Sequence, residues 1–187
     1  QKPSTISPSR IPTQNPSTAS PVKTAVMVGA YYYPWYFGGA FHGGKVLRFF
    51  LDPQQPPLLG KYNMTDPAVI LQHLMWSRKA NIGLWATSWW GPRSREDTTT
   101  INVILNHSDI GQHKIALLYE TNNRLRISGT NYSTAWIETD INHMCENYFS
   151  HPNYYQIDGR PVVFIYLTRS LSGMKILDSV LILMKAQ

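Results

Sequence analysis

The sequence predicts an α/β fold built from four β/α units. Short apolar segments alternate along the chain with segments of helical periodicity, and this order is typical of βαβ architecture. The predicted strands are continuously apolar, as expected for parallel strands covered by helices. Two arrangements fit this pattern, an open doubly wound sheet or the N-terminal half of a (β/α)8 barrel. A whole barrel needs about 250 residues, and the chain has 187.

The first 24 residues differ from the rest of the chain. Ser, Thr and Pro dominate residues 1–24, and almost none of these side chains could be buried in a core. Such a segment cannot compensate the conformational entropy lost on ordering. We therefore expect a disordered linker or stem at 1–24 and one folded domain over 25–187.

The first β/α unit has the clearest boundaries. An apolar, β-rich segment at 25–33 predicts a strand that ends at Pro34. After a long loop, Asp66 and Pro67 predict the start of a helix, with Asp66 as N-cap and Pro67 at the first helical position. Apolar residues then recur at helical spacing, namely Ile70, Leu71, Leu74 and Met75.

The other units repeat this pattern. Strands are predicted at 82–90, 114–120 and 161–167, and helices at 98–106, 134–149 and 171–185. The apolar stripe of the helix at 134–149 consists of Ile137, Ile141, Met144, Cys145 and Tyr148. Cys145 is the only cysteine, so we expect a buried structural thiol there.

Composition and motifs exclude several functional classes. The net charge is +6, half of it comes from Lys2, Arg10 and Lys23, and no Lys/Arg cluster for nucleic acid is present. No apolar run approaches the ~20 residues of a membrane span. The histidines lack metal-ligand spacing and no G-x-S-x-G motif occurs, so we expect no metal, no cofactor and no serine nucleophile.

Glycosylation sequons indicate a compartment. The motif N-x-S/T occurs at Asn63, Asn106 and Asn131, in predicted loops or at helix ends. These three sequons favour the secretory pathway, either the Golgi lumen or the extracellular space.

Aromatic and polar residues gather where the predicted strands end, which is where the working residues of β/α barrels lie. The candidate substrate-binding residues are Tyr33, Trp35, Trp89, Trp90, Glu120 and Tyr166. Rings that can stack on a sugar, mixed with hydroxyl and carboxylate groups, predict a glycan-binding cleft. The alternative is that these rings fill the interior of a barrel.

The acidic residues can be sorted by position. Asp66 is expected to be a helix cap, and Glu138, Asp140, Glu146 and Asp178 lie in or beside predicted helices, where solvent-exposed faces explain them. Glu96 and Asp97 remain in the loop after the second strand. Glu120 is the hardest to explain structurally, because a charge beside a buried strand needs a partner or a function.

Six short motifs occur in order over about 25–170: V-G-A-Y-Y-Y-P-W-Y (28–36), P-P-L-L-G-K-Y (56–62), D-P-A-V-I (66–70), S-W-W-G-P (88–92), A-L-L-Y-E-T (116–121) and G-R-P-V-V-F-I-Y-L-T-R (159–169). As a set they resemble the glycoside hydrolase family 99-like group. This group includes endo-α-mannosidases and WbsX-like proteins associated with polysaccharide synthesis, and the loops resemble the WbsX-like branch more closely.

The resemblance implies a (β/α)8 barrel that, when complete, cleaves α-mannose-type glycans internally with retention. It places the catalytic acid and base in a Glu-x-x-Glu motif late in the barrel, and these 187 residues contain no such motif. We therefore expect no catalytic residue within this chain, no turnover by it alone, and a missing C-terminal half of the barrel. The alternatives are a non-catalytic carbohydrate-binding protein and a WbsX-like polysaccharide-biosynthesis protein.

Overall fold

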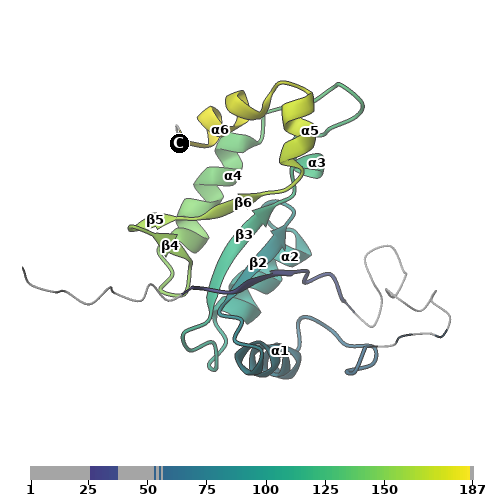
Figure 1. The fold of residues 1–187 in the computed structure, drawn as a ribbon, viewed down its shortest axis with the longest axis vertical. Helices are drawn as coiled ribbons and strands as arrows, with labels where there is room; N and C mark the ends of the chain where they lie inside the picture. Colours follow the sequence, from purple (N-terminus) through teal and green to yellow (C-terminus); the bar gives the residue numbers. More distant parts are fainter. Residues whose placement is uncertain (1–25, 38–52, 54, 56, 186–187) are drawn as a thin grey trace, which may run out of the picture.

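A computed structural model describes residues 26–37, 53, 55 and 57–185 of the chain (Figure 1). The predicted disordered segment at 1–24 and the domain boundary at 25 lie outside the described residues. No helix of the described part is long and apolar enough to cross a membrane.

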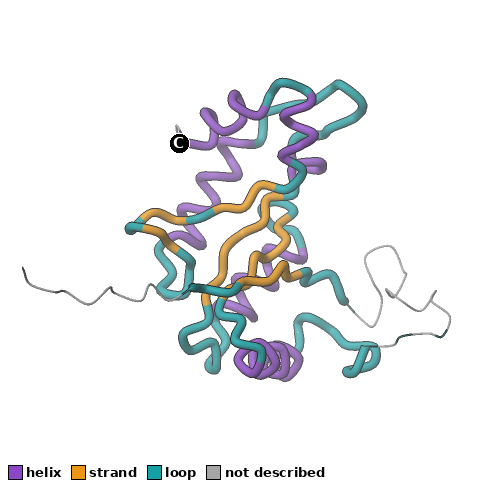
Figure 2. Tube along the Cα trace, viewed as in Figure 1, coloured by secondary structure: helices purple, strands orange, loops and turns teal. Residues whose placement is uncertain are grey.

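The centre of the fold is a parallel sheet of four strands in the order β1-β2-β3-β6 (Figure 2). Its strands are β1 (Gly29–Tyr32), β2 (Leu84–Trp89), β3 (Lys114–Tyr119) and β6 (Val163–Ile165). A small antiparallel hairpin, β4 (Gln156–Ile157) and β5 (Arg160–Pro161), precedes β6. Consecutive parallel strands joined by helical connections form half of a (β/α)8 barrel, so the predicted fold is confirmed.

Helices follow each strand of the sheet. They are α1 (Pro67–Lys79), α2 (Arg95–Thr99), η1 (Thr100–Leu105), α3 (Thr121–Arg124), α4 (Ile137–Met144), η2 (Cys145–Phe149), α5 (Thr168–Gly173) and α6 (Leu177–Lys185). The predicted cap of α1 is confirmed, because the Asp66 carboxylate accepts a hydrogen bond of 2.9 Å from the Ala68 amide. Both η1 and η2 are π-helical segments that continue α2 and α4.

The two faces of the sheet have different surroundings. One face packs on the helices, and its residues Trp85, Trp89, Ile115, Leu117 and Tyr119 join the main hydrophobic core. The opposite face carries Tyr31, Leu84 and Phe164, which line an open apolar groove, and Tyr31 is 66% exposed. In a closed barrel this second face points to the barrel axis.

Two predictions from the helix pattern are wrong. The helix predicted at 171–185 is two helices, because Lys175 takes a left-handed conformation (φ +59) that ends α5 before α6 begins. Cys145 is exposed. The other members of the predicted stripe, Ile137, Ile141, Met144 and Tyr148, are buried as expected.

Thr87 gives a stability prediction. Its side chain is fully buried on β2, and its Oγ1 has no hydrogen-bond partner in the described structure. Thr87→Val removes this unpaired hydroxyl at nearly constant shape, so we expect the free energy of unfolding to rise by about 1 kcal/mol. Urea denaturation measures it. Thr98→Val is the control, because the exposed Thr98 hydroxyl donates to the Ser94 carbonyl (3.0 Å) and its removal brings no gain.

Candidate functional site

The carboxyl ends of the four parallel strands carry five of the six predicted site residues. Tyr33 and Trp35 follow β1, Trp90 follows β2, Glu120 follows β3 and Tyr166 follows β6. We call these five residues the rim. The strands are adjacent and parallel, so their ends lie at one edge of the sheet, where side chains from distant parts of the sequence meet.

A serine that the sequence analysis did not select lies at the centre of the rim. Ser88 Oγ accepts hydrogen bonds from Trp35 Nε1 (3.1 Å) and Trp90 Nε1 (2.9 Å), and it donates to Glu120 Oε1 at 2.6 Å. The two indole rings meet edge to face, with centroids 5.9 Å apart. One hydroxyl thus joins residues from three strand ends.

Glu120 is a nearly buried carboxyl group at the rim, with only 5% of its surface exposed. Burial raises the pKa of Glu120 above its ordinary value, the hydrogen bond from Ser88 lowers it, and the negative charge of Glu96 raises it again. A poorly solvated carboxyl group gains more from each hydrogen bond it accepts than one in bulk water.

Two tyrosines flank this carboxyl group. Tyr33 is 38% exposed and Tyr166 is 42% exposed. The pKa of Tyr33 is raised by partial burial and by the charges of Glu120 and Tyr166, so both of these groups lie within electrostatic reach of Tyr33. The Tyr33 ring also contacts Trp35, with centroids 4.7 Å apart. The Thr121 hydroxyl holds the Tyr166 backbone by a 2.6 Å bond to its carbonyl.

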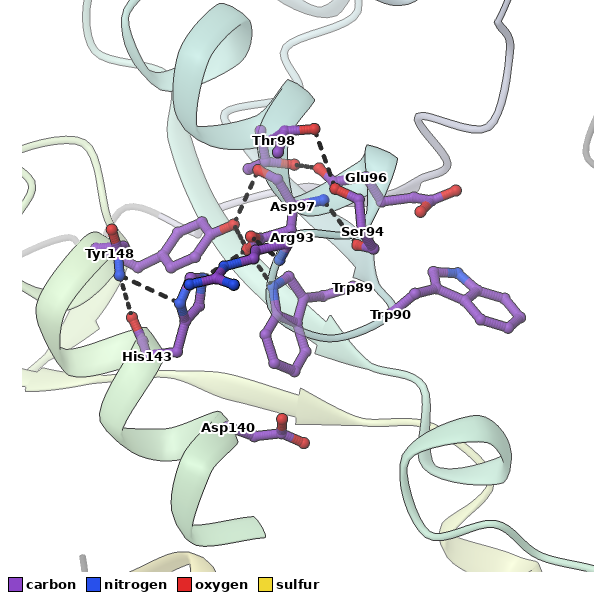
Figure 3. A network of polar contacts seen from close by, with 12 residues as sticks. Trp89, Trp90, Arg93, Ser94, Glu96, Asp97, Thr98, Asp140, His143 and Tyr148 are labelled. Atoms are coloured by element: carbon purple, nitrogen blue, oxygen red, sulfur yellow. Dashed lines mark hydrogen bonds and ion pairs between the residues drawn. The ribbon is translucent and has the colours of Figure 1, made fainter. Parts of the chain in front are cut away.

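Trp89 lies elsewhere. Successive side chains of a strand point to opposite faces, and Trp89 is fully buried on the helix side of β2. Its Nε1 donates to Asp97 Oδ1 at 2.7 Å, and its ring stacks on Tyr119. Figure 3 shows Trp89 among Asp97, His143 and Tyr148, while Trp90 points away from this group. The structure therefore separates Trp89 from the other five candidates.

Two interpretations of acidic residues are corrected. Asp140 was expected on a solvent-exposed face, but it is fully buried, where it accepts from Tyr119 Oη (2.7 Å) and forms an ion pair with Arg124. Glu96 and Asp97 were placed in a loop, but both lie in the first turn of α2, and Asp97 accepts from Trp89, Tyr148 and His143. His143 and Tyr148 lie far from Asp97 in the sequence, whereas Trp89 lies only 8 residues before it.

The sequence model of glycosyl hydrolase family 99 matches residues 50–175 of the chain. The chain belongs to glycosyl hydrolase family 99. Glycoprotein endo-alpha-1,2-mannosidase of Mus musculus is 26% identical over 122 residues, which are 59% of this family-99 chain and 24% of that protein. The chain therefore spans about a quarter of this curated relative.

Solved structures show the same fold. A GH99 endo-alpha-mannosidase from Bacteroides thetaiotaomicron, in complex with Bis-Tris propane, superimposes with a TM-score of 0.58 at 24% identity, over 77% of this chain and 42% of that one. A second structure of that organism's GH99 endo-alpha-mannosidase gives 0.54 at 23% identity, over 74% and 44%. The family-99 chain thus spans less than half of these enzymes.

Gly91 in the β2 loop of this family-99 chain is required by its surroundings. It has φ +110, and a Cβ atom there would lie under 3.0 Å from the Arg124 guanidinium. That guanidinium packs between Asp140 and the Trp90 carbonyl. Gly91→Ala is therefore expected to lower the free energy of unfolding by about 1–3 kcal/mol. Thermal melting compares this variant with Gly60→Ala. Gly60 also has positive φ (+63), but a Cβ atom there would have no neighbour within 4 Å. An equal loss of stability in both variants would show that packing against Arg124 is not the cause.

Proposed function

We propose that this protein is an endo-acting, retaining glycoside hydrolase of α-mannose-type glycans whose rim binds the sugar. The observation that carries the proposal is the buried Glu120 carboxyl group, held by Ser88 among the exposed or half-buried rings of Tyr33, Trp35 and Trp90. Membership of family 99 and the names of the relatives supply the substrate class.

The rim offers the two kinds of contact that a sugar needs. Aromatic rings can stack on the C–H face of a pyranose, as they do on other flat or apolar surfaces. Glu120 and the phenol groups of Tyr33 and Tyr166 can bond its hydroxyl groups. A carboxylate accepts hydrogen bonds only, so in its ionised form Glu120 pairs with hydroxyl donors of the glycan.

Catalysis by a glycosidase needs two carboxyl groups in separate roles. The family resemblance places that pair in a Glu-x-x-Glu motif that these 187 residues do not contain. We therefore assign binding to the rim and expect these residues by themselves to bind glycans without cleaving them. A carbohydrate-binding protein without catalysis, or a WbsX-like biosynthetic protein, would share the rim and differ in the catalytic pair.

Calorimetric titration tests the assignment. The full-length protein is titrated with an α-1,2-linked mannotetraose, chosen from the name of the mouse relative, and with cellotetraose as a control of equal length. We expect saturable binding of the mannose oligosaccharide alone, and release of shorter mannose products identifies the hydrolase. Binding without any products supports the non-catalytic alternative, and no binding of either sugar contradicts the proposal.

A further inference from the structure

We propose that Ser88 is the positioning residue of the rim, whose single hydroxyl fixes the Glu120 carboxyl group and the indoles of Trp35 and Trp90 in the arrangement that binds the glycan. The inference deepens the proposed function and rests on it. Ser88 does not itself contact the sugar, so its part is separate from those of the rim residues.

The direction of every hydrogen bond at Ser88 follows from which of its partners can donate and which can accept. An indole N–H can only donate, so the Trp35 and Trp90 bonds occupy both lone pairs of the serine oxygen. The Ser88 hydroxyl can then only donate its proton, and it donates it to Glu120 Oε1 at 2.6 Å. The hydroxyl is thus saturated and has no capacity left for a ligand.

The position of Ser88 in the sheet explains how one hydroxyl reaches residues from both neighbouring strand ends. Ser88 precedes the last residue of β2 and is fully buried on the face opposite to Trp89. Trp35 reaches it from the loop after β1, and Glu120 follows β3 on the other side of β2. A short hydroxyl at the middle strand is therefore within reach of both neighbouring strand ends.

The carboxyl group is left partly free for the sugar. Ser88 occupies one acceptor position of Glu120 Oε1, while a carboxylate offers about four in all. The charge of Glu96 in α2 raises the pKa of Glu120, and the charge of Glu120 in turn raises the pKa of Tyr33 after β1. Ser88 lowers the pKa of Glu120, while burial and Glu96 raise it. Loss of the serine hydroxyl therefore leaves influences that raise the pKa.

The first test needs no glycan. Glu120 is followed by carbon-13 NMR through a pH titration of the full-length protein and of Ser88→Ala. We expect the Glu120 titration to move to higher pH in Ser88→Ala and to stay in place in Thr87→Val, where the neighbouring strand hydroxyl has no partner. An unchanged titration in a folded Ser88→Ala protein overturns the inference, whatever the glycan results are.

The second test measures affinity for the same α-1,2-linked mannotetraose. Without the serine hydroxyl, binding must itself order the side chains of Glu120, Trp35 and Trp90, and we expect this cost to make Ser88→Ala bind about tenfold more weakly. Thr87→Val is expected to bind as the parent does. Equal affinities of Ser88→Ala and the parent contradict the positioning role, whereas no binding by the parent contradicts the proposed function instead.

A further variant covers the case in which Ser88→Ala does not fold. Ser88→Cys keeps the size of the side chain but supplies only a weak donor and acceptor. We expect Ser88→Cys to shift the Glu120 titration upward and to weaken mannotetraose binding, in both cases less than Ser88→Ala does. A Ser88→Cys protein that matches the parent in both measurements overturns the inference.

Discussion

Replacing Asp97 by Ala is expected to lower the free energy of unfolding by about 3–5 kcal/mol, the largest effect of any single substitution considered. Asp97 Oδ1 accepts from Tyr148 Oη (2.6 Å), Trp89 Nε1 (2.7 Å) and His143 Nε2 (3.0 Å). The Tyr148 and Trp89 side chains are fully buried, so both donors would lose their partner away from water. The carboxylate thereby links α2 to α4 and η2 (Figure 3).

Thermal melting of the full-length protein measures this loss. For a domain of about 150–250 residues a loss of about 3–5 kcal/mol corresponds to a fall in Tm of roughly 10 °C. Glu146→Ala is the matched control, because Glu146 is an exposed acid on η2, and its Tm should stay within about 2 °C of the parent. An Asp97→Ala protein that melts with the control would show that the network does not stabilise the fold.

Glu120→Gln is expected to weaken binding of the α-1,2-linked mannotetraose by about 10- to 100-fold. Gln keeps the shape and can still accept from Ser88, but it has no charge and replaces one acceptor oxygen by an NH2 donor. Calorimetry measures the loss. Asp66→Asn is a control that removes a carboxylate from the exposed cap of α1 and should not change the affinity.

The Tm of Glu120→Gln, compared with that of the parent, should depend on pH. Burial raises the pKa of Glu120, so the folded protein holds this proton more tightly than the unfolded chain. Ionisation therefore costs stability as the pH rises through the raised pKa, and Gln avoids that cost. We expect the Tm of Glu120→Gln, relative to the parent, to increase from about pH 4 to about pH 8. A constant or falling difference would contradict this explanation of Glu120.

The sequence predicted what depends on local patterns. Apolar segments and the Asp66 cap located the strands and the start of α1, because these signals lie within a few neighbouring residues. The same patterns indicated Glu120, since a carboxyl group at the end of an apolar strand is rare. They also placed Trp89 in the site, although the alternation of side chains along β2 separates Trp89 from Ser88.

The remaining features depend on partners that local patterns do not contain. Asp97 and Asp140 are buried because Tyr148 and Arg124, distant in sequence, pair with them. The role of Ser88 becomes visible only in the structure, where Trp35 and Glu120 from two other strand ends form hydrogen bonds with it. The available signal was a small polar residue near the end of a buried strand, but Thr87 beside it in β2 gives the same signal without these partners.

The indole N–H resonances of the protein test the central claim, that the glycan binds at the carboxyl ends of the strands. In nitrogen-15 spectra recorded with increasing α-1,2-linked mannotetraose, the Trp35 and Trp90 signals should shift, because both indoles belong to the rim. The signals of Trp85 and Trp89, which bond Ser77 and Asp97 on the helix side, should stay in place. Shifts confined to Trp85 and Trp89, or unchanged signals of Trp35 and Trp90 at saturation, would contradict it.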